Sequence, residues 1–221
     1  MGNDVHNPRP IITTQNADVD LLRPTPDMIH AEDIALAMAR TVRYNGHSDA
    51  LVTLLDHVAV CDGLATEMGI EDPQLRLAIL LHDAHEAYTG DITRPVKDLI
   101  NSESNGLITK LEDRLDRAIC AAFELPEDYL SRPDVRKVIK QIDNTALGVE
   151  VRHGWPKIVA EDRWDNVPKS TEGGKSSFYQ AQSCDPEQLH IGFLTRVSAL
   201  VGAIYYAKHG AAVEGSEHVV H

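Results

Sequence analysis

One stretch of the chain, LHDAHEAYTGD at residues 81–91, indicates both the fold and the chemistry. It places His82 beside Asp83 in what we expect to be an apolar helix, and Glu86 follows one turn later. Burying ionisable side chains costs free energy unless something replaces their contacts with water. A divalent cation can replace them, because imidazole and carboxylate groups are its ligands. Residues three and four apart share a helix face, so the stretch predicts a metal site with a nearby carboxylate, Glu86, to handle protons.

Composition limits the alternatives. The 221 residues can form one domain, and 43% hydrophobic with 25% charged residues is ordinary for a globular protein. The net charge of −13 disfavours general nucleic-acid binding. No apolar run approaches the ~20 residues of a membrane span, and the polar start MGNDVHNPRP does not resemble a signal peptide. Three scattered cysteines, Cys61, Cys120 and Cys184, indicate reduced thiols, so we expect a cytoplasmic protein without membrane association.

The hydrophobic pattern predicts an all-α fold, with no strand and no internal repeat. Residues 1–26 are expected to be irregular, residues 27–209 to form one helical domain, and residues 210–221 to be a flexible tail. One helix is expected between Asp72-Pro73, a cap followed by Pro, and Gly90. Residues 154–184 are polar and contain Gly and Ser, which predicts a long irregular loop before the last helix. The other helices are expected at about 27–43, 49–68, 104–123, 133–151 and 186–209.

Two further residues extend the metal hypothesis. His57 lies in the second expected helix beside Leu54 and Val58, on or near its buried face. Asp143 lies among the core positions of the fifth. Each alone is weakly informative, because most His residues near an apolar face are hydrogen-bonded core residues. Their occurrence together with the His82-Asp83 pair, on three separate helices, favours one shared cation.

With these residues in place, the chain resembles the HD-domain phosphohydrolase superfamily, whose pattern is H…HD…D on a helical scaffold. It is most similar to the branch of bacterial 5′-deoxynucleotidases and phage-type deoxynucleoside triphosphohydrolases. Three segments carry the resemblance: RYNGH (43–47), LLHDAHEAYTGDITRPVK (80–97) and QIDNTALGVE (141–150). It spans about residues 28–150 and implies a single HD-type helical domain that hydrolyses deoxynucleotides.

The resemblance also implies roles for individual residues. It makes Glu86 the catalytic acid that positions or deprotonates water, and it places Asp91 at the mouth of the site near the sugar. It places Arg43 and Tyr44 near the bound nucleotide. The metal ligands that it implies are His57, His82, Asp83 and Asp143.

Two positions depart from the family pattern. VTLLD at 52–56 stands where relatives often show a run like Ser-Val-Ala-Gln. His85 replaces a residue that is frequently small, and we expect it at the pocket rim or in solvent. The second departure leaves room for a different metal or substrate preference.

The residue types alone, independently of the family resemblance, indicate the same metal-dependent chemistry. Two imidazoles and two carboxylates suit Mn, Co, Fe, Zn or Mg, and the set leaves open the identity of the metal. A bound metal lowers the pKa of water and screens a phosphoryl group. Arg43, Arg94 and Lys97 are candidates to bind phosphate oxygens, although each could also be an ordinary surface cation.

Three functions remain open at this stage. The leading one is metal-dependent hydrolysis of a deoxynucleotide, either a monophosphate or a triphosphate. The second is a catalytically silent module that binds metal or nucleotide, and the intact Glu86 and Asp91 argue against it. The third is a purely structural helical protein, which predicts no metal dependence. A homo-oligomer is compatible with the apolar last helix, but no residue requires it, and base preference is open.

Overall fold

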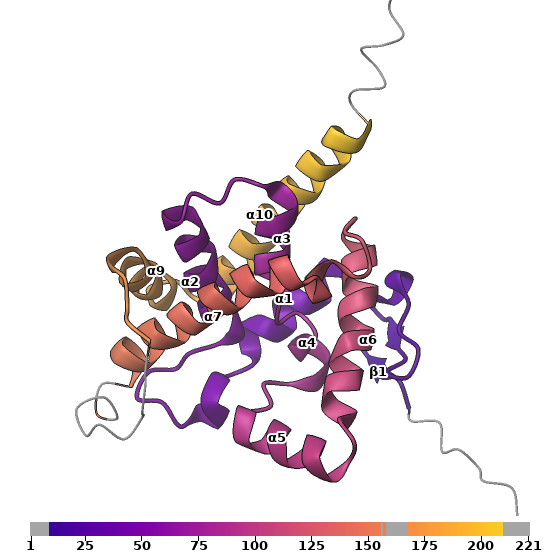
Figure 1. Cartoon of the computed structure of the whole chain (residues 1–221), viewed down its shortest axis with the longest axis horizontal. Coiled ribbons are helices and arrows are strands. Elements are labelled where there is room, and N and C mark those ends of the chain that lie inside the picture. The colour runs from indigo at the N-terminus through magenta and orange to yellow at the C-terminus, as the bar shows by residue number, and fades with distance from the viewer. Residues whose placement is uncertain (1–8, 156, 158–167, 210–221) are drawn as a thin grey trace, which may run out of the picture.

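The computed structural model describes residues 9–155, 157 and 168–209, and within them it is an all-α fold (Figure 1). Three short 3₁₀ segments, η1 (Pro26–Met28), η2 (Arg43–Gly46) and η3 (Tyr129–Ser131), lie between the longer elements. The all-α prediction is therefore confirmed. The helices are α1 (Ala31–Arg40), α2 (Leu54–Glu67), α3 (Pro73–Leu81), α4 (Glu86–Thr89), α5 (Arg94–Glu103), α6 (Leu107–Ala122), α7 (Pro133–Gly154), α9 (Glu172–Gln182) and α10 (Pro186–His209).

A short hairpin precedes the helices, so the prediction of an irregular segment without strands was wrong for residues 9–26. Strands β1 (Ile11–Ile12) and β2 (Asp18–Val19) pair antiparallel. The Asp33 carboxylate of α1 accepts hydrogen bonds from the Thr14 hydroxyl (2.6 Å) and the Gln15 amide (3.0 Å), which ties the hairpin to α1. Residues 1–8 and the expected tail at 210–221 lie outside the described residues.

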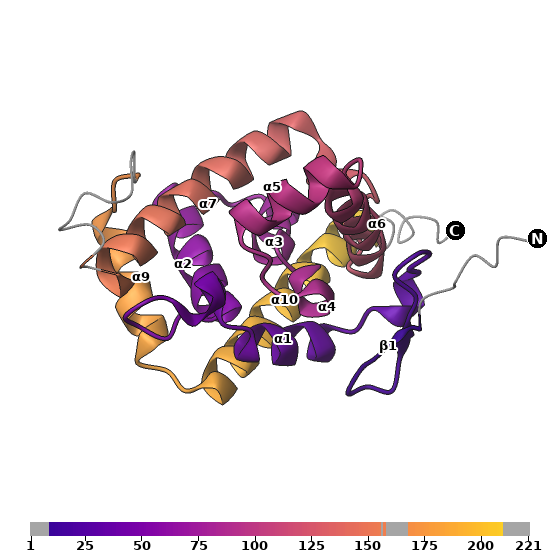
Figure 2. The same cartoon turned by 90° about the horizontal axis from the view of Figure 1, so that it is seen from below.

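Helix α2 is the centre of the fold, and α1, α3, α7, α9 and α10 all contact it. Figure 2 shows it between α1 and α7. Its start is fixed by a capping box, in which the Thr53 hydroxyl accepts from the Asp56 amide (3.2 Å) and the Asp56 carboxylate accepts from the Thr53 amide (2.7 Å). The segment that departs from the family pattern therefore starts this helix, five residues later than predicted. Leu55 and Leu64 of α2 belong to two different hydrophobic clusters, so α2 is buried on several sides.

The expected helix between Pro73 and Gly90 is interrupted. Asp72 caps α3 as predicted, but α3 ends at Leu81, and α4 begins only at Glu86. Between them the amides of Ala84 and Glu86 bond three residues back, to Leu81 (3.0 Å) and Asp83 (3.0 Å). This 3₁₀-type tightening makes residues i and i+3 eclipse. Asp83 and Glu86 therefore lie one above the other, whereas the sequence predicted them within a continuous α-helix.

Two more helices were missed. Residues 94–103 form α5, separated from α6 by Asn105 and Gly106, whose φ angles of 54° and 74° end the helix. Residues 172–182, predicted as part of a long loop, form α9, which buries Phe178 and Ala181. Its Gly and Ser residues are poor helix formers. Packing stabilises it instead, because a Cβ on Gly63 of α2 would lie 2.0 Å from Ser177 Oγ, an approach that only glycine permits.

Helix α10 buries a stripe of residues spaced at helical intervals, Phe193, Val197, Leu200 and Ile204. Its last turns extend beyond the body of the molecule (Figure 1). By length and composition α10 meets the criteria for a membrane span, contrary to the expectation that no run would. Core helices of soluble proteins pass the same test, so this finding decides nothing about membranes.

Candidate metal centre

Of the four side chains predicted as metal ligands, three lie around one nitrogen of the fourth, His57 Nε2. It is 3.3 Å from His82 Nε2, 3.6 Å from Asp83 Oδ2 and 3.4 Å from Asp143 Oδ1. His82 Nε2 is in turn 3.3 Å from Asp83 Oδ2. Two ligands of a tetrahedral ion at ~2.1 Å stand about 3.4 Å apart. The distances from His57 Nε2 to the other three donors, and from His82 Nε2 to Asp83, therefore fit one shared ion.

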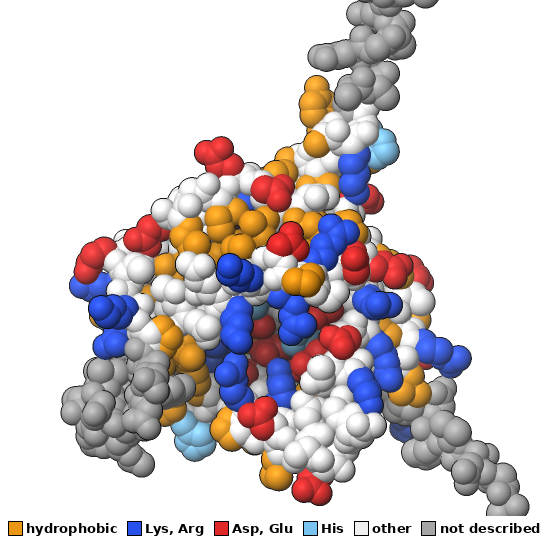
Figure 3. Space-filling view, in the orientation of Figure 1, with side chains coloured by type: hydrophobic (Ala, Val, Ile, Leu, Met, Phe, Trp, Pro, Cys, Tyr) orange, Lys and Arg blue, Asp and Glu red, His pale blue; other side chains and the backbone are white. Residues whose placement is uncertain are grey.

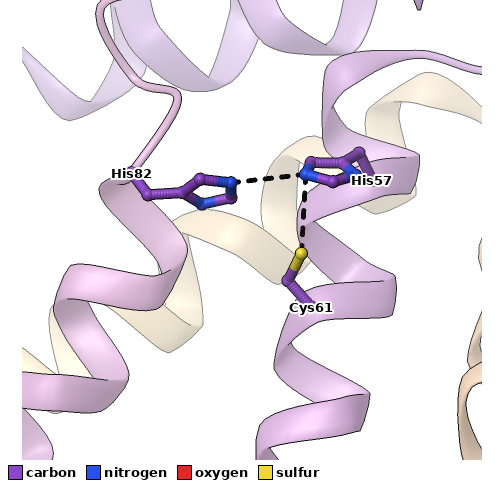
Figure 4. A group of neighbouring side chains, drawn as sticks. All are labelled: His57, Cys61 and His82. Atoms are coloured by element: carbon purple, nitrogen blue, oxygen red, sulfur yellow. Dashed lines mark hydrogen bonds between the residues drawn. The ribbon is translucent and has the colours of Figure 1, made fainter. Parts of the chain in front are cut away.

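Hydrogen bonds on the far side of each ring fix how the two imidazoles face each other. His82 Nδ1 lies 2.8 Å from the Ile79 carbonyl oxygen, and His57 Nδ1 lies 2.5 Å from Glu150 Oε1. Both partners are acceptors, so Nδ1 carries the proton in each neutral ring. The two Nε2 atoms then face each other (Figure 4). The Asp83 and Asp143 carboxylates lie beside them. Electron-pair donors arranged in this way can hold a cation between them.

The electrostatics of the cluster agree with this geometry. Burial lowers the pKa of His82, but the Asp83 carboxylate outweighs burial and raises that pKa to about 10. Burial would raise the pKa of Asp83, yet His82, His57 and Arg43 hold it well below its ordinary value. The pKa of Asp143 is also lowered against burial, chiefly by its contact with His57. The centre therefore favours positive charge, which protons supply when no metal is bound.

Glu150 of α7 was not predicted as part of the site. It is 1% exposed and holds three side chains at once. Besides His57 Nδ1, its carboxylate accepts from Arg43 Nε (3.2 Å) and from the Tyr44 hydroxyl. A carboxylate that orients a ligating imidazole is a recurrent feature of metal sites. The available signals were an acid between Val149 and Val151 and its spacing of seven residues from Asp143 on the same helix.

Cys61 is a second feature that the sequence reasoning missed. It lies one turn after His57 on α2, is fully buried, and places its Sγ 3.5 Å from His57 Nε2 (Figure 4). His57, Cys61 and His82 form a group whose ligand atoms all lie within 4.8 Å of one another. A soft sulfur ligand is thus available beside the nitrogen and oxygen donors.

Arg43 and Tyr44, predicted to contact the nucleotide, are held by protein carboxylates. Arg43 is buried between Glu150 and Asp83, with Nη1 3.7 Å from Asp83 Oδ2. Tyr44 has a φ of 58°, which is unusual for a residue with a side chain. Its amide donates to Asp91 Oδ2 (3.0 Å) and its hydroxyl donates to Glu150, so both ends of the residue are fixed. Asp91 therefore lies beside η2 as a backbone acceptor.

Glu86 begins α4 and is 7% exposed. Burial, together with the nearby Asp83 charge, raises its pKa to about 8. Its Oε2 is buried, and no hydrogen-bond partner for it occurs in the part of the chain that the structure describes. A carboxylate with a raised pKa and a free oxygen is suited to accept a proton.

A cleft of about 880 Å³ opens between α6 and α7, and His82, His85 and Asp143 line it. Five cationic side chains also line it: Arg94, Arg117, Arg136, Lys137 and Lys140. Figure 3 shows Lys and Arg side chains around a recess on this face, with acidic and His side chains inside it. Among the described residues Arg94 makes no ion pair, whereas Lys97 binds Glu112 at 2.6 Å. Arg94 is thus free for an anion and Lys97 is not.

Comparison with known proteins gives relatives without a described activity. The chain is 37% identical over 136 residues to the uncharacterized protein RCAP_rcc00048 of Rhodobacter capsulatus, an alignment that covers 60% of this chain and 66% of that protein. It is 27% identical over 126 residues to the uncharacterized protein YfdR of Escherichia coli K12, covering 57% of this chain and 61% of that protein. The chain thus spans less than two thirds of either relative. No family model matches it.

Proposed function

We propose that this protein is a metal-dependent phosphohydrolase that acts on deoxynucleotides. The observation that carries the proposal is the convergence of four side chains: donors of His82, Asp83 and Asp143 lie 3.3–3.6 Å from His57 Nε2. The resemblance of the LLHDAHEAYTGDITRPVK segment to HD-domain phosphohydrolases supports the same chemistry. A divalent cation bound there would lower the pKa of water and offset charge on a phosphate. The donor set suits Mn, Co, Zn, Fe or Mg, and the identity of the divalent cation is left open.

The residues of the chain divide the remaining work. Glu86 accepts a proton from the attacking water, because its carboxylate is buried beside Asp83 with an oxygen free. Arg94 binds phosphate oxygens from the wall of the cleft. Glu150 holds His57 and Arg43 in place, so Arg43 acts as a positioning residue that balances the charge of Asp83 and Glu150.

The test uses the full chain, stripped of metal and reloaded with Mn²⁺ or Co²⁺. A panel of ribo- and deoxynucleoside mono- and triphosphates is offered, and released phosphate, polyphosphate and nucleoside are identified. Glu86→Gln should keep metal binding and lose turnover by about 10²–10⁴-fold. Glu71→Gln, an exposed carboxylate outside the cleft lining, is the matched control and should keep wild-type turnover.

The outcomes separate the alternatives. Metal binding without turnover of any nucleotide would favour the catalytically silent module. Absence of metal binding would favour a purely structural protein. Asp143→Ala should lower metal occupancy, and it should remove the stabilisation by metal that wild type shows in a thermal melt.

A further inference from the structure

The sequence suggested that His85 lies at the pocket rim or in solvent; in the structure it lines the cleft, but it is buried, with 7% of its surface exposed. Its Nδ1 lies 2.9 Å from Asp116 Oδ1, so in the neutral ring Nδ1 donates to that carboxylate and Nε2 keeps a lone pair. Nε2 is buried and has no hydrogen-bond partner among the described residues. It lies 3.7 Å from Glu112 Oε1, an oxygen that is already bound to Lys97 at 2.6 Å.

A second unpartnered atom lies beside it. Glu86 Oε2 is also buried without a partner in the described part of the chain. Ligand atoms of Asp83, His85 and Glu86 all lie within 4.8 Å of one another. Leaving a buried polar group unsatisfied destabilises the fold, and native structures rarely leave two together.

The chemistry of the three groups selects their missing partner. Two carboxylates and a neutral imidazole all offer electron pairs, so a hydrogen-bond acceptor cannot satisfy them, whereas a proton on His85 Nε2 or a metal cation can. The Asp116–His85 pair is the carboxylate–imidazole arrangement that orients a ligating ring toward a metal. It has the same form as the Glu150–His57 pair at the first centre.

We propose that Asp83, His85 and Glu86 bind a second divalent cation beside the one held by His57, His82, Asp83 and Asp143. The Asp83 carboxylate belongs to both sets of ligands. The 3₁₀-type turn at residues 82–86 makes this possible, because it brings Asp83 and Glu86 onto one side. His85 and His82 both line the cleft, so both cations would face the same bound molecule.

The binding site is inferred from this geometry alone, whereas its role rests on the proposed function. Two neighbouring cations can bind the attacking and leaving oxygens of a phosphoester together. Glu86 can bind a cation through one oxygen and keep the other for the proton of the attacking water.

The test counts metal ions without measuring turnover. Metal-free full-length protein is titrated with Mn²⁺ by calorimetry, and bound metal is counted after desalting. We expect two Mn²⁺ per wild-type chain and one per chain of His85→Ala or His85→Gln, with electron paramagnetic resonance showing a coupled pair only in wild type. His190→Ala, which removes a surface imidazole paired with Glu32 at 3.0 Å, is the control and should keep two. Circular dichroism establishes that each variant is folded.

Asp116→Asn should weaken the second site by about 10–100-fold and leave the first unchanged, because Asp116 orients only His85. One Mn²⁺ per wild-type chain, or two in both His85 variants, would overturn the second site and leave the proposed function standing. No Mn²⁺ at all would overturn both.

Discussion

Replacing Glu150 by Gln tests how the first centre is held together. The substitution keeps the size of the side chain but removes the charge that faces His57, Arg43 and Tyr44. The amide oxygen can still accept from His57 Nδ1. The amide nitrogen, however, is a donor and would face the donors of Arg43 and Tyr44.

Two effects of known size follow. Removing one partner of a buried ion pair costs about 3–5 kcal/mol, so the free energy of unfolding should fall by about that amount. Arg43, whose Nη1 is already 3.7 Å from Asp83, would then turn to that carboxylate and compete with the metal for it. Together with the weakened hold on His57, this should raise the Kd for Mn²⁺ by about 10–100-fold.

Urea unfolding of the metal-free protein measures the first effect, and calorimetric titration with Mn²⁺ measures the second. The double variant Glu150→Gln with Arg43→Met provides the control, because it removes the uncompensated cation. It should recover part of the stability and little of the metal affinity, since His57 stays poorly oriented. Wild-type metal affinity in Glu150→Gln would refute the reasoning.

The pH dependence of stability gives an independent check on Glu150. Burial raises the pKa of Glu150, but the charges of Arg43 and His57 and the hydrogen bonds from His57 and Tyr44 outweigh burial and bring it below the ordinary value of 4.5. A carboxylate with a lowered folded pKa stabilises the protein above its unfolded pKa and loses that contribution as the pH falls through the folded value. In acid, wild type should therefore lose stability faster than Glu150→Gln.

Three further predictions concern other parts of the structure. Gly148→Ala should lower the free energy of unfolding by about 1–3 kcal/mol in urea, because the added Cβ would lie 2.3 Å from the Pro168 carbonyl oxygen; unchanged stability would contradict this packing. Arg94→Ala should raise KM for nucleotides about tenfold or more with little change in kcat, and an unchanged KM would exclude it from substrate binding. Burial lowers the pKa of His85, but Asp116 outweighs burial and raises this pKa to about 9. In metal-free protein, the contribution of His85 to the free energy of unfolding is therefore full below pH 6.5 and is lost as the pH rises through 9. Thermal melts should show wild type exceeding His85→Gln at pH 6 and losing that margin by pH 10.

Much of the helical fold could be predicted, because apolar periodicity and caps are local signals. Asp72-Pro73 and Gly90 marked two helix ends correctly. Helix α9 could not be predicted, since its Gly173-Gly174 pair disfavours a helix, and it forms through close packing on α2. The break after Leu81 was also missed, because the apolar pattern continues through it while the hydrogen bonds change to three-residue spacing.

The candidate site follows the same division. The set of four donors could be proposed because the His82-Asp83 pair is rare on an apolar segment and two other helices supply His57 and Asp143. The role of Glu150 could not be predicted, because an acid near the end of a helix is ordinarily exposed. Only the fold buries Glu150 and places its carboxylate against His57 Nδ1. For Arg43 the sequence suggested a role that the fold does not favour. Its charge predicted binding of phosphate oxygens, whereas in the structure it is buried against the carboxylates of Asp83 and Glu150.

The most direct test of the account is the location of the metal. A crystal of the full chain soaked in Mn²⁺ should give an anomalous difference peak above the manganese absorption edge, with donor distances of about 2.0–2.3 Å to His57 Nε2, His82 Nε2, Asp83 and Asp143. Such a peak, lost below the edge, is the result that we expect. A well-ordered crystal without it, or with Mn²⁺ bound away from His57, would contradict the central claim.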